Sequence, residues 1–174
     1  AAAAPQAQAT LARKAPKPPG ALAALQAVRP LSGVRTVIAG SDGKGAFVDG
    51  AGTAARFSRP SEMTVDYGRR LVFVADTRNH CIRCVGLESG VTATVAGRAG
   101  TAGFADGAGA AALFSSPSGI FFEPDSGVLY VADRDNHCIR AVDPKRAYEV
   151  RTVCGAPREP GMRDAQIGSL ARFC

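Results

Sequence analysis

The chain has 174 residues, of which 46% are apolar, and its 21 basic and 15 acidic side chains give a formal charge of +6. No uninterrupted run of about 18 apolar residues occurs, which excludes a transmembrane helix. Recurrent clusters of valine, isoleucine, leucine and phenylalanine exclude a wholly disordered chain. With 20 glycines, 11 prolines and no tryptophan, the composition argues against a helical bundle and favours many short strands.

The positive charge is concentrated near the N-terminus. Five basic residues precede Asp42, the first acidic residue, so residues 1–41 carry +5 and the remaining residues carry +1, from 16 basic and 15 acidic side chains. A nearly neutral body gives little support to nucleic-acid binding. We expect the basic leader to contact a partner instead, through Arg13, Lys14, Lys17 and Arg29.

Residues 1–32 are predicted to form an extended leader rich in alanine and proline. The segment KAPKPPG (Lys14–Gly20) cannot be helical throughout, because prolines remove backbone donors and restrict the residues before them. We expect it to lie as a strap against another protein subunit. A leader without acidic residues is also typical of organellar transit peptides, so a chloroplast or mitochondrion is one interpretation of the compartment. The cysteines, interpreted as free thiols, predict an intracellular, reducing compartment.

An internal repeat organises the rest of the chain, residues 33–174. The segment from Phe47 (FVDGAGTAARFSRPSEMTVD) aligns without a gap with the segment from Phe104 (FADGAGAAALFSSPSGIFFE), 57 positions later. At the same spacing, VFVADTRNHCIRCV from Val72 aligns with LYVADRDNHCIRAV from Leu129. Each copy contains four short segments rich in β-branched or aromatic residues and bounded by turn residues, which predicts four antiparallel strands per repeat.

This pattern predicts an all-β fold, a partial β-propeller of four-stranded blades. The predicted strands of blade one are 61–66, 70–76, 80–86 and 90–97, and those of blade two are 118–123, 127–133, 137–142 and 148–155. The predicted organisation is an isolated outer strand at 33–40, blade one at about 57–97, blade two at about 114–155, and the start of a further blade at 156–174.

The combination of VADTRNHCIR, VADRDNHCIR, TVAG and FADGAGAAALFSSPSGI resembles the NHL-repeat propellers, in their version with long blades. The resemblance covers residues 33–174 and implies a ring of several blades, of which two are complete here. Members of that family include interaction modules, some enzymes and some RNA-binding proteins, so the resemblance alone leaves the function open.

The motif Asp-x-x-Asn-His-Cys-Ile-Arg occurs once in each complete repeat and is interpreted as structural. Its Asp and Asn are suited to a tight turn between strands, and its isoleucine is expected in the blade core. The repeat-motif residues are Asp76, Asn79, His80, Ile82, Asp133, Asn136, His137 and Ile139. Some NHL-like propeller enzymes bind zinc through histidines, so His80 and His137 are the candidate metal ligands, although no metal or other cofactor is expected.

The cysteines favour buried free thiols. Cys81 and Cys84 form a C-x-x-C pair in a predicted strand, where the odd spacing places them on opposite faces, and the second repeat keeps only Cys138. The glycine-rich loops at Asp49 and Asp106 lack a phosphate-binding pattern, and their carboxylates are expected to cap short helical turns.

The remaining charged side chains form a mixed surface. A loose basic set in blade one alternates with acidic residues and lacks interleaved aromatic side chains. It consists of Arg56, Arg59, Arg69, Arg70 and Arg78.

No nucleophile, base and orienting group can be assembled from the sequence. We therefore predict a noncatalytic interaction scaffold that binds other protein subunits within a larger assembly. The alternatives are a propeller domain of a larger enzyme, such as a lyase, hydrolase or redox-linked protein with its chemistry elsewhere, and an RNA-binding propeller.

Overall fold

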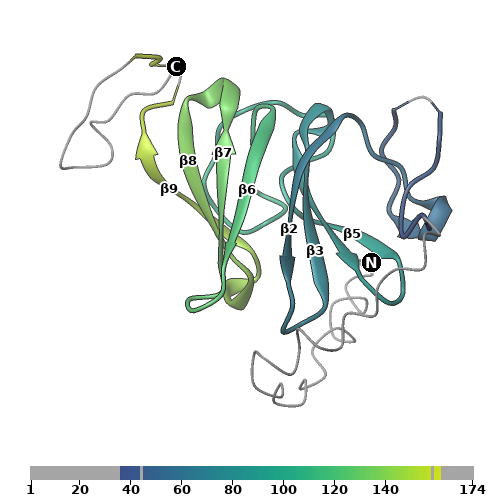
Figure 1. Ribbon diagram of the computed structural model, residues 1–174. Helices are drawn as coiled ribbons and strands as arrows, with labels where there is room; N and C mark the ends of the chain where they lie inside the picture. The colour runs from purple at the N-terminus through teal and green to yellow at the C-terminus, as the bar shows by residue number, and fades with distance from the viewer. Residues whose placement is uncertain (1–35, 44, 158, 162–174) are drawn as a thin grey trace, which may run out of the picture. The chain divides into compact units, whose positions relative to one another are not determined.

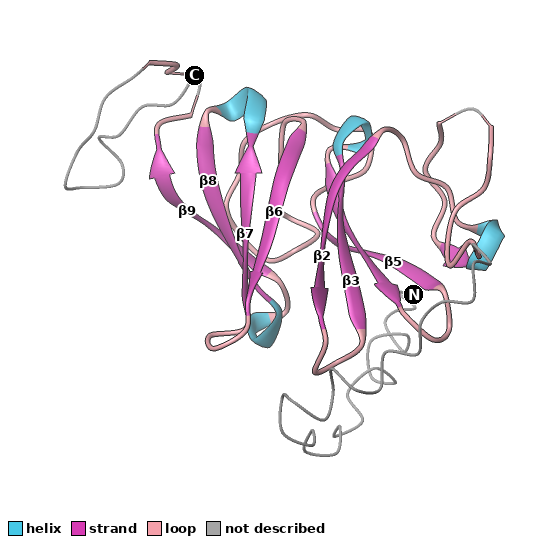
Figure 2. Cartoon of the chain, viewed as in Figure 1, coloured by secondary structure: helices cyan, strands magenta, loops and turns pink. Residues whose placement is uncertain are grey.

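The computed structural model describes residues 36–43, 45–157 and 159–161, which lie in the second of two compact units, Thr36–Cys174. The described residues form two antiparallel β-sheets, and short 3-10 turns connect several of the strands within them (Figures 1 and 2). They contain no helix long and apolar enough to cross a membrane. The predicted leader lies outside the described residues, as do most of the residues assigned to a further blade.

The first sheet is blade one, with its strands in the order β1-β5-β4-β3-β2. Every neighbouring pair is antiparallel, as expected for strands joined by short turns. The strands are β1 (Gly50–Ala51), β2 (Pro60–Asp66), β3 (Leu71–Asp76), β4 (Cys81–Gly86) and β5 (Val91–Ala96).

The second sheet is blade two, with its strands in the order β6-β7-β8-β9. These strands start or end within one residue of the predicted ones, because the turn residues between them bound each hydrophobic segment. They are β6 (Pro117–Glu123), β7 (Val128–Asp133), β8 (Cys138–Asp143) and β9 (Glu149–Gly155). The inner strands β2 and β6 each begin with a proline, which an edge strand tolerates because no neighbour needs its missing N–H.

Each connecting loop folds against the outer strand of the blade that follows it in the chain. In blade one β1 pairs with β5, and in blade two Gly107 bridges to Val150 at the equivalent position. The described part of the predicted outer strand 33–40 is different: residues 36–40 form a bend without strand pairing, and the Gly40 N–H binds the Gly52 carbonyl at 3.0 Å. The outer edge of blade one is covered by β1 from the glycine-rich loop.

The two blades meet along their inner strands, where side chains of β2 bind the backbone edge of β6. Glu62 Oε2 accepts from the Ile120 N–H at 3.0 Å, and Thr64 Oγ1 accepts from the Phe122 N–H at 3.1 Å. Ser61 Oγ donates to the Ser118 carbonyl at 2.7 Å. We call these three side chains the polar ladder. It satisfies backbone groups that an edge strand would otherwise leave without a protein partner.

The hydrophobic core lies between the blades. One face of blade one, with Phe73, Ile82 and Cys84, packs against the opposite face of blade two, with Leu129 and Val131. The rings of Phe73 and Phe122 stack with their centroids 6.2 Å apart. The sheets therefore support each other through apolar side chains that alternate along each strand.

Two adjacent phenylalanines test this packing. Phe122 is 8% exposed and Phe121, on the other face of β6, is 58% exposed. We expect Phe122→Ala to lower the free energy of unfolding by about 3–5 kcal/mol, because it leaves a cavity between the blades. Phe121→Ala is the matched control and should cost less than about 1 kcal/mol. Urea denaturation measures both, and equal losses would contradict the assigned faces.

Candidate functional site

A buried arginine is the centre of each blade's repeat motif. The Arg140 side chain is fully buried; its Nη1 donates to Asp133 Oδ2 at 2.7 Å, and its Nη2 donates to Asp106 Oδ1 at 2.6 Å. The same two nitrogens also donate to the carbonyls of Leu113, at 3.1 Å, and Ala105, at 2.7 Å. The guanidinium thus joins the strand motif to the loop that enters the blade.

Aromatic rings flank this guanidinium. Arg140 Cζ lies 4.6 Å from the centroid of Phe104 and 5.1 Å from that of Phe114. Blade one repeats the arrangement, with Arg83 between Phe47 and Phe57 at 4.7 and 4.9 Å. We call the arginine, its two carboxylates and its two rings the arginine lock. Guanidinium is suited to this position because its planar face stacks on rings while its edge donates to carboxylates.

The lock corrects the prediction for the glycine-rich loops. Asp49 does not cap the 3-10 turn η2 (Gly52–Ala54), whose N-cap is Ala51 without a side-chain hydrogen bond. Its carboxylate accepts from Arg83 Nη2 at 2.6 Å and from Thr94 Oγ1 at 3.2 Å. Leaving a buried guanidinium without a carboxylate costs more free energy than leaving an exposed turn without a side-chain cap.

The motif's Asp and Asn complete the lock from the strand side. Asp133 Oδ1 accepts from the Ser115 N–H at 2.7 Å, and Oδ2 accepts from Asn136 Nδ2 at 2.8 Å. Asn136 Nδ2 also donates to the Gly103 carbonyl at 2.8 Å. Asp76 and Asn79 make the equivalent bonds in blade one. These motif residues are buried, and their polar atoms are used within the blade.

The isoleucines of the motif differ in burial. Ile82 belongs to the core between the blades, whereas Ile139 lies on the other side of blade two and is partly exposed.

Replacing the arginine by lysine tests the lock. We expect Arg140→Lys to lower the free energy of unfolding by about 3 kcal/mol, because an ammonium cannot make the forked contacts to both carboxylates. Arg151→Lys, at an exposed position on β9, is the control and should change it by less than about 0.5 kcal/mol. Thermal and urea unfolding report the difference, and similar values for the two variants would contradict a structural role for Arg140.

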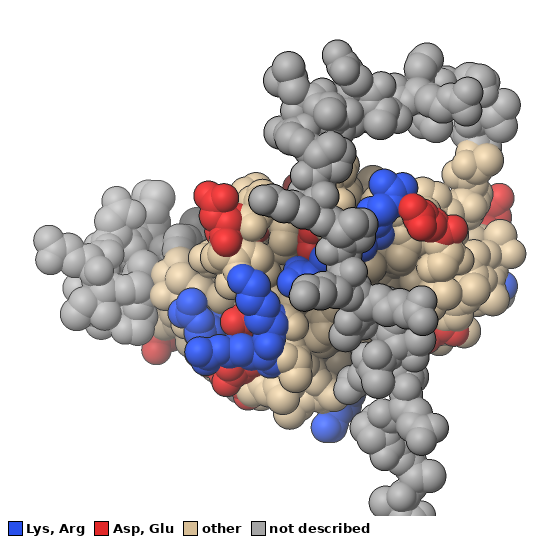
Figure 3. All heavy atoms as spheres, turned by 90° about the horizontal axis from the view of Figure 1, so that it is seen from below, with Lys and Arg blue, Asp and Glu red and all other residues tan. Residues whose placement is uncertain are grey.

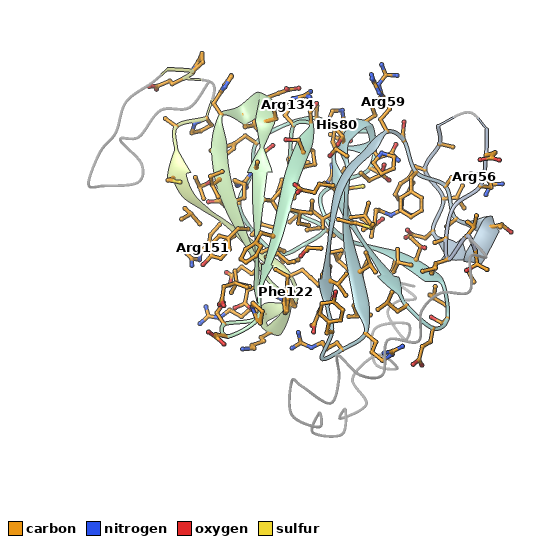
Figure 4. All side chains as sticks on the ribbon, viewed as in Figure 1. Arg56, Arg59, His80, Phe122, Arg134 and Arg151 are labelled. Carbon is orange, nitrogen blue, oxygen red and sulfur yellow. The ribbon has the colours of Figure 1, made fainter. Side chains whose placement is uncertain are left out.

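The motif histidine of blade one joins the two blades. His80 ends the 3-10 turn η3 (Thr77–Asn79) in the left-handed conformation, with φ 55°, and its Nδ1 accepts from the Ser116 N–H at 3.0 Å. His137 ends the turn η4 (Arg134–Asn136) with φ 54°, but its side chain makes no hydrogen bond to the described residues. Figure 4 shows His80 at the upper end of the sheets, between Arg59 and Arg134.

The two candidate metal ligands are not part of a metal centre in the described part of the chain. No group of three or more His, Cys, Asp or Glu side chains is placed there to hold an ion. His80 Nδ1 instead accepts a backbone N–H, which leaves Nε2 as its other polar atom.

The repeat supplies a matched pair for testing His80. We expect His80→Ala to lower the free energy of unfolding by about 1 kcal/mol more than His137→Ala, because only the first leaves a backbone N–H between the blades without its acceptor. Both variants place alanine in the same left-handed conformation, so that backbone penalty cancels. Equal losses in chemical denaturation would show that the bond to Ser116 contributes nothing.

The described cysteines are free thiols. Burial raises the pKa of Cys81, Cys84 and Cys138 to about 12. These three thiols are therefore protonated at neutral pH, and a protonated thiol is neither a good nucleophile nor a metal ligand.

A hollow of about 290 Å³ lies at the lower junction of the blades, and its lining includes Tyr67, Arg69, Phe122 and Lys145. Its cations already have partners: Arg69 Nη1 pairs with Asp66 at 3.0 Å, and Lys145 Nζ donates to the Ser126 carbonyl at 2.6 Å. Basic and acidic side chains are mixed on this lower face (Figure 3). The leader residues expected to bind a partner, Arg13, Lys14, Lys17 and Arg29, lie outside the described residues.

The arrangement of two four-stranded repeats packed through their inner strands defines a segment of a β-propeller. The family model for the NHL repeat matches residues 57–85 and 114–141, which include both copies of the motif. Each of the two complete repeats of this chain is therefore similar to the NHL repeat.

Curated relatives align with part of the chain. NHL repeat-containing protein 2 of Gallus gallus is 35% identical over 96 residues, covering 55% of this chain and 13% of the relative. The same protein from Bos taurus is 34% identical over 110 residues, covering 63% and 15%. The chloroplastic protein SUPPRESSOR OF QUENCHING 1 of Arabidopsis thaliana is 35% identical over 103 residues, covering 58% and 10%. The alignments thus cover 10–15% of the length of these relatives.

Solved structures show the same fold. An auxiliary nutrient binding protein from Bacteroides ovatus is 25% identical with a TM-score of 0.59, covering 71% of this chain and 32% of that one. Another from Bacteroides thetaiotaomicron is 22% identical with a TM-score of 0.55, covering 64% and 29%.

Proposed function

We propose that this propeller segment is a noncatalytic scaffold that binds other proteins within a larger assembly. The supporting observation is the set of large apolar side chains exposed along and beside the inner strands. Met63 is 68% exposed, Phe121 is 58% exposed, and Tyr67, in the turn after β2, is 83% exposed. Exposed large apolar groups favour association with another surface.

Unused backbone donors lie on β2, the strand that carries Met63. Met63 and Val65 occupy the positions in blade one that Ile120 and Phe122 occupy in blade two, where the polar ladder accepts from the N–H groups. No side chain in the described residues accepts from the N–H of Met63 or Val65. A protein partner that supplied acceptors there would bury both the donors and the neighbouring apolar groups.

The chemistry of the candidate site also favours binding over catalysis. The motif carboxylates are used by the arginine locks, and three of the cysteines are held as protonated thiols. The chloroplastic relative and the leader without acidic residues together support a chloroplast as the compartment for the assembly.

Site-specific crosslinking tests this proposal. A photoreactive amino acid at Met63, or in a second variant at Phe121, should form covalent products with other polypeptides in extracts of the native source. The same group at Arg151, an exposed residue on β9, is the control for chance contact. Mass spectrometry identifies the products. Crosslinks at Met63 and Phe121 no more frequent than at Arg151 would reject the scaffold proposal.

A further inference from the structure

Three exposed arginines lie at the upper end of blade one, on loops that are bound to each other. Arg59 immediately precedes β2, Arg78 lies in η3, and Arg98 follows β5. The Arg78 N–H donates to the Ser58 carbonyl at 3.0 Å, and the Gly100 N–H donates to the Asn79 carbonyl at 3.0 Å. These bonds hold the three loops side by side, and Figure 4 shows Arg59 at this end with its guanidinium directed outward.

The charges of these three arginines are not neutralised by neighbours. Among the described residues, none of the three forms an ion pair, whereas Arg70 and Arg146, and also Arg134 of blade two at the same upper end, each pair with a carboxylate. We call Arg59, Arg78 and Arg98 the upper arginines.

The repeat shows that the fold does not require these arginines. Blade two has Ser116, Asp135 and Ala156 at the equivalent positions, so each arginine is replaced by a neutral or acidic residue. The backbone is nevertheless in the same left-handed conformation at the first of these positions, with φ 49° at Arg59 and 52° at Ser116. Residues that folding requires, such as Arg83 and Arg140, are present in both blades. A cluster found in only one of two similar blades is therefore better explained by binding than by structure.

We propose that the upper arginines bind an acidic protein segment, one rich in aspartate and glutamate. Arginine forks bind carboxylates through paired, charge-assisted hydrogen bonds. The exposed large aromatic side chains of the described residues are Phe47, Tyr67 and Phe121, and none belongs to the three upper loops. A single-stranded RNA site would need such rings for base stacking. This inference rests on the proposed scaffold function and names the chemistry of one partner.

The blade-two sequence supplies substitutions suited to the test. Arg59→Ser and Arg98→Ala introduce the residues that blade two uses at these positions, so the double variant should fold. The matched control, Arg146→Ala with Arg151→Ala, removes two exposed positive charges from blade two. A third variant adds Arg78→Asp, again the blade-two residue. All variants keep the same basic leader, so its attraction for anions is common to every measurement.

The probe is a fluorescent peptide of about ten residues that alternates glutamate and serine, with a single-stranded oligouridylate of similar charge as the competing ligand. Fluorescence anisotropy at low salt measures the dissociation constants, and circular dichroism verifies folding. We expect the peptide to bind, its affinity to fall with salt, and the Arg59→Ser/Arg98→Ala variant to bind at least about fivefold more weakly. The control should stay within about twofold, and adding Arg78→Asp should weaken binding further, toward the level that the leader alone contributes.

Three results would overturn the inference: no peptide binding at low salt, an equal loss in the control variant, or tighter binding of the oligouridylate with the same dependence on the upper arginines. The last result would assign the face to RNA. None of these results decides the scaffold proposal, because its crosslinking test uses Met63 and Phe121, which lie on the inner strands. Conversely, the expected peptide binding together with crosslinks at Met63 and Phe121 no more frequent than at Arg151 would reject the scaffold proposal and not the peptide-binding inference.

Discussion

The buried guanidinium of each arginine lock is the interaction on which the blade depends. Removing a guanidinium from water costs several kcal/mol, and only a nearly complete set of acceptors offsets that cost. Arg140 finds its acceptors in the loop containing Asp106 and in the strand end at Asp133. Because both segments must be in place together, the loop and the strands order each other. The Nε atoms of Arg83 and Arg140 alone are left without a partner among the buried side-chain atoms of the described residues.

The lock also links the inside of a blade to the interface between blades. The loop that carries Asp106 and Phe104 runs between the two sheets, and its Ala112 and Phe114 are buried in the shared core. Phe114 therefore stacks on the guanidinium while it packs in the inter-blade core. A change that loosens Arg140 is expected to weaken both the blade and its contact with blade one. The equivalent ring in blade one, Phe57, remains partly exposed.

The sequence predicted the strands and their repetition well, because hydrophobic segments and turn residues are local signals. It did not predict the lock. Arg83 and Asp49 are 34 residues apart, and no helical or strand periodicity relates positions that distant. The glycine-rich surroundings of Asp49 favoured a local cap, although the motif arginine was visible at the same place in both copies. Equal spacing of an acidic and a basic residue in two repeats was the signal that could have joined them.

The differences between the blades show that their outer surfaces are not interchangeable. Glu62 and Thr64, which bind the edge of β6, are replaced in blade two by Gly119 and Phe121. A Cβ at Gly119 would lie 3.3 Å from Glu62 Oε2, so the glycine makes room for the carboxylate of the neighbouring blade. Blade two thus receives all three contacts of the polar ladder, but of the three side chains that make them it retains only the serine, as Ser118. Head-to-tail stacking of identical copies would therefore leave the Met63 and Val65 N–H groups without these acceptors.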